Sequence, residues 1–293
     1  MCLRRNKTIL SYFLLLVVLS LLLSCCPNSG DPGMENVKQG VKFSSAIFGE
    51  VKYTIYIPAN YNTDPSQKFP VLYLLHGGYS NHESYVCKIK LTSTIEQLME
   101  KGTFGPTIIV MPEGDMGWWM DSKDGNKRYK SFLLDELVPY IDTTYRTLEG
   151  REHRAIGGLS MGGFGSISLA FRFVTLFKAV AATSAAIPPS IEEAENFDQF
   201  GDTFGSPFDR EYYWERDPLT LAETAADIDS LAIYMDVGAS DPISKRGCEK
   251  LDSLLTARGI AHQFTVYPGG HDDTYFNAHI NELLEFVWGE IHP

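Results

Sequence analysis

A single serine lies between glycines in the segment Gly158-Leu159-Ser160-Met161-Gly162, which fits the pattern G-x-S-x-G. The segment follows a short apolar run and precedes a helix-like run, and in that context the pattern forms a sharp strand-to-helix turn. Small residues flank the serine because larger side chains would collide there, and the turn points the hydroxyl outward. Glycine and serine are also common in ordinary turns, so the pattern by itself has limited specificity. Ser160 is a candidate nucleophile that requires two partners.

A serine hydroxyl becomes a good nucleophile when an imidazole takes its proton and a carboxylate orients that imidazole. After a nucleophile on this kind of turn, the acid precedes the histidine along the chain. His271 fits this order because it lies in the glycine-rich segment YPGGHDD, directly after the last strand-like run. The segment YMDVGASDP offers two acids, Asp236 at the end of a strand and Asp241 on the loop beyond it. We favour Asp241, which has the freedom to turn toward His271, and keep Asp236 as the alternative.

A second glycine-containing segment, LLHGGYS at residues 74–80, ends a strand-like run in His-Gly-Gly. Such a strand end leaves backbone N–H groups uncovered, as an oxyanion hole requires. The predicted donors are the N–H groups of Gly78 and Met161, and Met161 also begins the helix whose positive dipole end favours negative charge. His76 is predicted to be a structural hydrogen-bonding residue. The remaining histidines that we considered are predicted to lie at the surface or in the core: His153, His262, His279 and His292.

The elements that must position these residues alternate between strand-like and helix-like patterns. VKYTIYI, residues 51–57, alternates like a half-exposed edge strand, whereas VLYLL, TIIVM, RAIGG, KAVAATS and LAIYMDV are typical of buried strands. LTSTIEQLMEKG and YKSFLLDELVPYIDTTY are helix-like and lie between them. This alternation predicts the α/β class, with a mainly parallel central sheet and helices on both faces.

Residues 186–223 break the alternation, because they are rich in proline, glycine and aromatic residues. We predict an aromatic-rich insertion before the acid-bearing strand, lying over the carboxyl edge of the sheet, where ligands bind in open α/β sheets. The segment GDMGWWMDS follows a strand, so Trp118 and Trp119 are predicted to line the substrate pocket. The alternative, that both rings pack beneath the insertion, stays open.

The composition is that of a globular protein, with 293 residues, 44% of them hydrophobic and 21% charged. The net charge is -12 and there is no long cluster of Lys and Arg, which argues against binding nucleic acid. At the N-terminus, Arg4, Arg5 and Lys7 precede the apolar run YFLLLVVLSLLL, the layout of an export signal. The tetrapeptide LLSC resembles the lipobox of bacterial lipoproteins, which implies that Cys25 is the lipid-modified first residue of the mature chain.

These features predict a signal peptide at residues 1–24, a flexible tether at 25–40 and a folded domain at 41–293. Three of the basic residues and none of the acidic ones lie in the signal, so the mature chain would carry a net charge of -15. The alternative is an uncleaved N-terminal helix, because the 18 residues 9–26 carry no charge. Both arrangements place the domain outside the cytoplasm, in the periplasm or at the outer membrane or cell surface. The two cysteines of the domain either form one disulfide or are separate buried thiols: Cys87 and Cys248.

Six segments together resemble the esterase-D-like putative esterase family: REHRAIGGLSMGGFGS, VLYLLHGG, VMPEGDMGWWMDS, ELVPYID, DVGASDP and YPGGHD. That family contains feruloyl and acetyl esterases acting on plant polysaccharides, tributyrin esterases, S-formylglutathione hydrolases, siderophore esterases and mycobacterial mycolyltransferases. The resemblance covers about residues 41–291 and implies an α/β-hydrolase fold. It implies a catalytic triad of Ser160, Asp241 and His271, with the oxyanion hole at Gly78 and Met161. REHRAIGGLSMGG is especially similar to feruloyl esterase modules attached to xylanases.

The resemblance and the residues together predict a serine carboxylic-ester hydrolase that removes acetyl or feruloyl groups from carbohydrate esters through an acyl-enzyme. Two alternatives are an acyltransferase with the same triad and a non-catalytic glycan-binding lipoprotein. Export argues against the S-formylglutathione branch. No cofactor is expected, and no metal site, because no histidine pair has ligand spacing and the segment HDD offers too few ligands. The expected partners are an ester substrate, small or polymeric, and the membrane that holds the lipid anchor.

Overall fold

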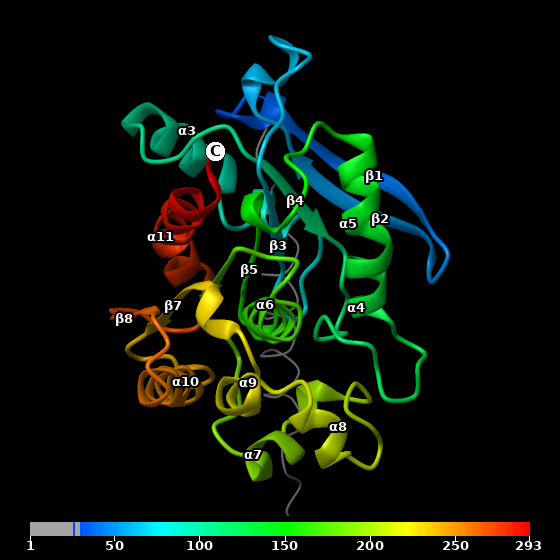
Figure 1. The fold of residues 1–293 in the computed structure, drawn as a ribbon, viewed down its shortest axis with the longest axis vertical. Helices are drawn as coiled ribbons and strands as arrows, with labels where there is room; N and C mark the ends of the chain where they lie inside the picture. Colours follow the sequence, from blue (N-terminus) through cyan, green and yellow to red (C-terminus); the bar gives the residue numbers. More distant parts are fainter. Residues whose placement is uncertain (1–25, 27–29) are drawn as a thin grey trace, which may run out of the picture.

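The computed structural model describes residue 26 and residues 30–293 (Figure 1). The predicted signal peptide and the predicted lipidation site at Cys25 lie outside these described residues. Within the described part of the chain, none of the helices has the length and apolar character needed to cross a membrane.

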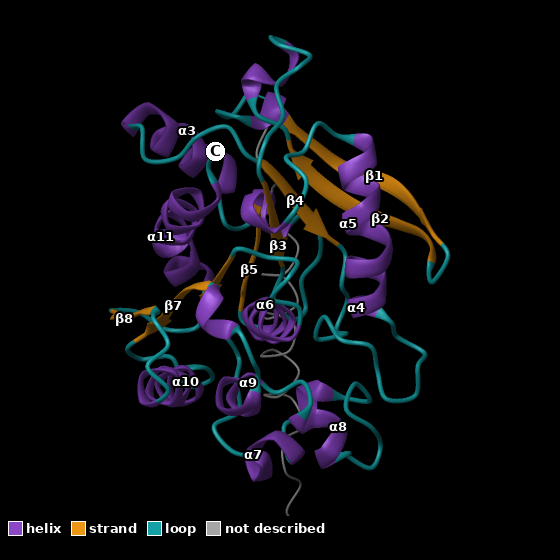
Figure 2. Ribbon diagram, in the orientation of Figure 1, coloured by secondary structure: helices purple, strands orange, loops and turns teal. Residues whose placement is uncertain are grey.

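Eight strands form one sheet in the order β1-β2-β4-β3-β5-β6-β7-β8 (Figure 2). β1 pairs with β2 and β2 with β4 in antiparallel fashion, and all the other neighbours are parallel. The predicted α/β class with a mainly parallel sheet is confirmed. The strands are β1 (Val37–Ser45), β2 (Gly49–Tyr56), β3 (Val71–Leu75), β4 (Ile108–Pro112), β5 (Arg154–Leu159), β6 (Ala179–Thr183), β7 (Ala232–Gly238) and β8 (Gln263–Tyr267).

Two predictions about the start of the domain are wrong. Residues 51–57 were expected to form an edge strand. They lie largely in β2, which is between β1 and β4, and the strand at the edge of the sheet is β1. β1 begins at Val37, so residues 37–40 belong to the sheet and not to the tether expected at 25–40. The sequence VKQGVKFSS is largely polar, and its strand conformation depends on antiparallel pairing with β2, a long-range contact that local pattern does not reveal.

Helices cover both faces of the sheet (Figure 1). α3 and α11 pack on the face that buries Leu72 and Leu74, whereas α5, α6 and α10 pack on the face that buries Tyr73 and Leu75. Because helices cover both faces, the parallel strands carry apolar side chains on both sides. In the sequence they are therefore continuous apolar runs. The helices are α2 (Ser84–Cys87), α3 (Leu91–Lys101), α4 (Tyr129–Ser131) continuing through a π-helical segment (Phe132–Leu137) into α5 (Val138–Thr144), α6 (Met161–Arg172), α7 (Ile191–Glu195), α8 (Arg210–Trp214), α9 (Pro218–Thr224), α10 (Lys245–Ala257) and α11 (Asp273–Ile291), with short 3-10 helices at Met34–Asn36, Ala59–Asn62, Arg151–His153, Asp198–Phe200 and Ile228–Ser230.

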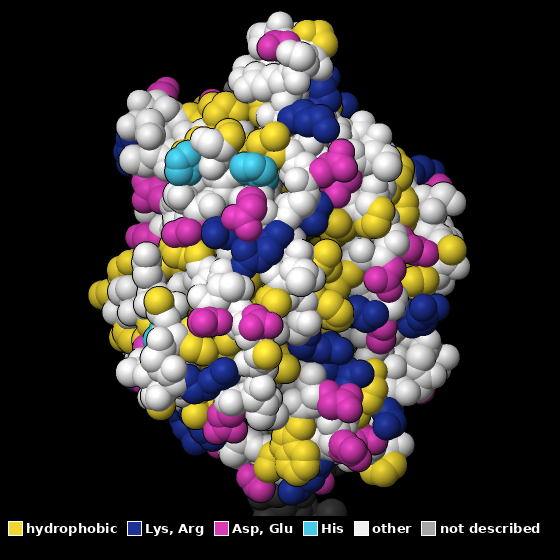
Figure 3. Space-filling model, viewed as in Figure 1, with side chains coloured by type: hydrophobic (Ala, Val, Ile, Leu, Met, Phe, Trp, Pro, Cys, Tyr) yellow, Lys and Arg dark blue, Asp and Glu magenta, His cyan; other side chains and the backbone are white. Residues whose placement is uncertain are grey.

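The predicted insertion, residues 186–223, contains α7, α8 and α9 and an aromatic cluster. Its rings pack on Trp118, in the loop after β4, and the Trp118 indole N–H donates to the carbonyl of Gln199 at 2.8 Å. The insertion therefore contacts a loop at the carboxyl edge of the sheet. On the face of the molecule seen in Figure 3, acidic and basic side chains are interspersed and no large basic patch is visible.

Candidate active site

The turn between β5 and α6 carries Ser160. Its backbone has φ 55° and ψ -119°, a strained conformation for a residue with a side chain. Two backbone hydrogen bonds stabilise this conformation. The Ser160 N–H donates to Thr183 O in β6 at 3.1 Å, and Ser160 O accepts from the Ala186 N–H at 3.1 Å. The predicted turn is present, and it sets the hydroxyl at the carboxyl edge of the sheet.

Two glycines of the G-x-S-x-G segment are required by close packing around this turn. A Cβ at Gly162 would lie 1.9 Å from the carbonyl oxygen of Leu75 at the end of β3. A Cβ at Gly158 would lie 2.5 Å from the carbonyl carbon of Gly162. Both clashes involve backbone atoms, which cannot move aside as a flexible side chain can.

Gly162→Ala is expected to lower the free energy of unfolding by about 3 kcal/mol or more, because the added methyl group forces β3 and α6 apart. Gly289→Ala is the matched control, since it also lies in a helix but has no atom within 4 Å of the added Cβ. That control should be neutral or slightly stabilising. Urea unfolding followed by circular dichroism measures both, and equal midpoints would contradict the packing argument.

Ser160, His271 and Asp241 form a continuous hydrogen-bonded chain. The His271 Nε2 atom lies 2.8 Å from Ser160 Oγ, and His271 Nδ1 lies 2.8 Å from Asp241 Oδ2. His271 is in the loop between β8 and α11, and Asp241 is in the loop between β7 and α10. Three loops at one edge of the sheet thus bring together residues from three parts of the chain. These distances are suitable for proton transfer from the hydroxyl to the imidazole.

The environment of Asp241 keeps its carboxylate charged and fixes its orientation. Its Oδ1 atom accepts from the backbone N–H groups of Ile243 and Ser244, at 2.8 and 2.9 Å, which leaves Oδ2 facing His271. Burial alone would raise the pKa of Asp241, but the hydrogen bonds from His271 and from these two N–H groups outweigh it, so the pKa is lowered. Asp241 is therefore ionised at neutral pH.

Ser244 is a site residue that the sequence analysis missed. Its hydroxyl donates to the carbonyl of Ser184 at 2.8 Å and lies 3.3 Å from His271 Nδ1, while its N–H holds Asp241. The signal in the sequence is a serine three residues after the acid, in DPIS, just before α10. Such a spacing is common in turns, so it gains meaning only once Asp241 is placed beside His271.

Asp236, the alternative acid, has a structural position. It is fully buried, and its carboxylate accepts from the Tyr275 hydroxyl at 2.6 Å and from the Thr183 hydroxyl at 3.0 Å. These bonds join β6, β7 and α11, and none of them reaches His271. Burial raises the pKa of Asp236 to about 7, although the hydrogen bonds from Tyr275 and Thr183 oppose that rise.

This raised pKa predicts how stability depends on pH. The folded state raises the pKa of Asp236 from 3.8 to about 7, so it binds the proton more tightly than the unfolded chain does. The resulting stabilisation is complete below about pH 4 and is lost as the pH rises toward 7. Relative to Asp236→Asn, the parent protein should lose unfolding free energy across this range, as measured by urea titrations. A difference between the two proteins that does not change with pH would contradict the assignment.

A pocket of about 140 Å³ opens beside Ser160 and His271. Gly78 lies in its wall, in the loop after β3, and Met161 is the first residue of α6 directly after the nucleophile. A Cβ at Gly77 would lie 3.3 Å from the Ser160 Cβ, so this loop runs against the nucleophile turn. The predicted oxyanion residues are thus on the two segments that border Ser160. The other lining residues are Ser80, Ser84, Lys88, Ile89, Leu159, Asp273 and Phe276.

The substrate-binding prediction for Trp118 and Trp119 is wrong in position, because the structure places both rings in the core. Their exposed fractions are 1% and 0%, and neither lines the pocket at Ser160. The ring of Trp119 fills space left by the absent side chains of Gly114 and Gly165, where an added Cβ would lie 2.5 and 2.6 Å from Trp119. The alternative prediction, that the rings pack beneath the insertion, is correct for Trp118, which contacts Phe200 of the insertion.

His76 has the structural position predicted for it. It is buried, its Nε2 atom accepts from the Gly114 N–H at 3.0 Å, and its carbonyl accepts from the Trp119 indole at 3.2 Å. It therefore fixes the loop after β4 against the end of β3, next to Gly78.

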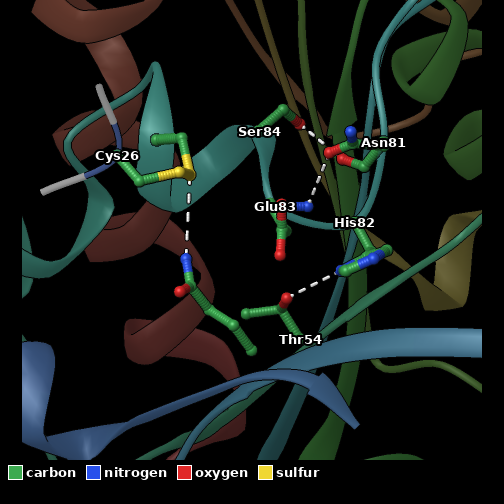
Figure 4. The surroundings of a disulfide bond; sticks show 8 residues. Cys26, Thr54, Asn81, His82, Glu83 and Ser84 are labelled. Carbon is green, nitrogen blue, oxygen red and sulfur yellow. Dashed lines mark hydrogen bonds between the residues drawn. A yellow bond between two sulfur atoms is a disulfide. The ribbon is translucent and has the colours of Figure 1, made fainter. Parts of the chain in front are cut away.

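The cysteines pair in a way that the sequence analysis did not anticipate. Cys87 is bonded to Cys26 (Figure 4), and Cys248 is a free, buried thiol, so the possible bridge between Cys87 and Cys248 is not formed. Cys26 lies in the tether predicted at residues 25–40, and nothing local in the sequence indicates that it contacts α2. In the described part of the chain, the one group of side chains spaced for a metal is Cys26, Glu83 and Cys87. Its two sulfurs are bonded to each other and are not free thiolates.

Comparisons with known proteins agree on the family. Residues 44–287 match the family model described as Putative esterase. Esterase Rv1288 of Mycobacterium tuberculosis is 27% identical over 259 residues, covering 78% of this chain and 54% of that protein. The acetyl esterase of Caldicellulosiruptor saccharolyticus is 24% identical over 243 residues, covering 76% of this chain and 84% of that protein.

The chain spans about half the length of the mycobacterial relative. Among solved structures, a ferulic acid esterase superposes with a TM-score of 0.75 at 27% identity, over 86% of this chain and 98% of that one. The family match covers most of the described chain, and this structural neighbour shares its sheet and helices. The chain therefore belongs to the putative esterase family and has the α/β-hydrolase fold.

Proposed function

We propose that this protein is a serine carboxylic-ester hydrolase that removes acetyl or feruloyl groups from carbohydrate esters. The observation that carries the proposal is the chain of 2.8 Å contacts from Ser160 through His271 to Asp241 at the wall of a pocket. The names of two relatives, an acetyl esterase and a ferulic acid esterase, support the choice of acyl group.

In the proposed mechanism, Ser160 Oγ attacks the carbonyl carbon of the ester while His271 Nε2 takes the hydroxyl proton. The N–H groups of Gly78 and Met161 donate to the oxyanion of the tetrahedral intermediate. His271 then gives the proton to the departing alcohol, which leaves an acyl group on Ser160. A water molecule, deprotonated by His271, releases the acid and restores the serine. Asp241 stabilises the imidazolium in both steps.

The pocket walls fit an ester between a polar alcohol and an acyl chain. Ser80, Ser84 and Lys88 offer hydrogen-bonding groups, whereas Ile89 and Phe276 offer apolar surface. Polar groups placed beside apolar surface in one pocket orient a small ligand.

Mass spectrometry after reaction with a fluorophosphonate probe tests the proposal, together with turnover of p-nitrophenyl acetate, methyl ferulate and acetylated xylan. We expect a covalent adduct on Ser160 and turnover of at least one carbohydrate or feruloyl ester. Folded protein without an adduct would point to the non-catalytic alternative. Turnover of a short-chain triglyceride without turnover of methyl ferulate or acetylated xylan would refute the substrate class.

We also propose that the protein is exported and anchored by lipid on Cys25. The basic residues before the apolar run, the tetrapeptide LLSC and the absence of acids before Asp31 support this proposal. The disulfide between Cys26 and Cys87 supports export, because disulfides persist in oxidising compartments outside the cytoplasm. Mass spectrometry of the N-terminal peptide should find a diacylglyceryl group on Cys25. A peptide that still contains residues 1–24 would favour the uncleaved helix.

A further inference from the structure

The disulfide joins the start of the described chain to the helix α2. Cys26 is bonded to Cys87, the last residue of α2, although 61 positions separate them in the sequence (Figure 4). The Gln39 side chain, from β1, also donates to the Cys87 sulfur at 3.7 Å. The N-terminal segment is thus covalently fixed to the domain well before the first strand begins at Val37.

The helix α2 is also part of the pocket wall. Ser84, three residues before Cys87, and Lys88, one residue after it, both line the pocket at Ser160. One turn of helix rises about 5.4 Å, so the disulfide lies within about one turn of the pocket wall. The Tyr85 hydroxyl donates to the carbonyl of Leu75 at 3.0 Å, which attaches α2 to the end of β3.

The disulfide changes how far the domain can extend from an anchor at Cys25. Without it, the chain from Cys26 to Gly33, which is buried against α3, could extend up to about 23 Å. With it, a single peptide unit of about 3.8 Å separates the anchored residue from the attachment point. The tether expected from the sequence is thereby replaced by a rigid attachment beside the pocket.

We propose that the Cys26–Cys87 disulfide fixes the domain to the membrane at the wall of its ester pocket, an attachment called the mount below. The anchored enzyme then hydrolyses small diffusing esters faster than long polysaccharides. The inference rests on the proposed ester hydrolysis and on the proposed anchor. A long polymer that crosses the pocket would collide with the bilayer, because Ser84 and Lys88, on either side of the attachment residue Cys87 in the sequence, are themselves part of the pocket wall. Acetylated or feruloylated oligosaccharides can enter.

A protease site inserted after Gly30 tests the mount without measuring activity. Gly30 is exposed, and no atom would lie within 4 Å of a Cβ added there. After cleavage of the full chain in membranes, the domain should stay with the membrane and leave it when dithiothreitol is added. In the same chain carrying Cys87→Ser, cleavage alone should release the domain. Release of the parent domain without reductant would overturn the mount, and so would retention of the Cys87→Ser domain or a chain that is soluble before cleavage.

Ester turnover by the same membranes tests the substrate restriction. Cys26→Ser removes the mount and leaves the pocket residues intact. On acetylated xylan, membrane-bound parent should be about fivefold slower than membrane-bound Cys26→Ser, because the variant regains a tether of residues 26–32 between the anchor and the domain. On p-nitrophenyl acetate the two should agree within about twofold, since the substitution is outside the pocket.

The domains released by cleavage and dithiothreitol serve as the matched control, and they should hydrolyse the polymer at equal rates. Equal polymer rates in the membrane-bound forms would overturn the restriction. If no form hydrolyses any ester, the proposed function fails, while the cleavage experiment still decides whether the mount exists.

Discussion

Ser160→Ala is expected to lower kcat for p-nitrophenyl acetate by a factor of about 10⁴ to 10⁶ and to abolish labelling by fluorophosphonate. The reason is that no acyl-enzyme can form without the hydroxyl that lies 2.8 Å from His271. The remaining rate would come from binding and from the N–H groups of Gly78 and Met161. KM should change much less than kcat, because alanine removes the nucleophile and leaves the pocket wall in place.

Ser166→Ala is the matched control for this variant. Ser166 is a buried serine on the same helix, α6, and its hydroxyl donates to the Gly163 carbonyl at 3.1 Å without reaching the site. We expect its kcat to remain close to that of the parent, with a small loss of stability of about 1 kcal/mol. If Ser160→Ala hydrolyses the ester as fast as Ser166→Ala does, the nucleophile is another residue.

Local pattern was sufficient for the parallel strands because they are buried on both faces. VLYLL corresponds to β3, and the other apolar runs match their strands within one or two residues. A strand with two buried faces needs apolar residues throughout, and that signal does not depend on its partners. β1 is different, since six of the nine residues in VKQGVKFSS are polar or glycine, and antiparallel pairing with β2 holds it in place.

The position of a side chain relative to the site was harder to predict than the position of its element. Ser160, Asp241 and His271 meet because each follows a parallel strand, and the carboxyl ends of these strands share one edge. Trp118 and Trp119 also follow a strand, yet they point into the core. The space that receives Trp119 comes from Gly114, in the same loop, and from Gly165, which is distant in sequence. The bond of Cys26 to Cys87 depends in the same way on a contact between distant segments.

Asp241→Asn is expected to lower kcat/KM for p-nitrophenyl acetate by a factor of about 10⁴. The two backbone N–H groups of Ile243 and Ser244 donate to one oxygen of Asp241, so the amide of asparagine must keep its oxygen there. Its NH₂ group then faces His271 Nδ1 and can only donate to it. A histidine that accepts at Nδ1 carries its proton on Nε2, where it cannot take the proton of Ser160.

Asp236→Asn is the matched control, because it changes the other buried acid of the same segment. Its carboxylate is bonded to Tyr275 and Thr183 and not to His271. Asparagine can accept from one of these hydroxyls with its oxygen and donate to the other with its NH₂ group. We expect kcat/KM to stay within about tenfold of the parent, since the proton-transfer chain is intact. The ratio of the two variants decides which acid orients the imidazole. Equal losses would mean that the link from Asp236 through Tyr275 to the start of α11 positions His271 as strongly as Asp241 does.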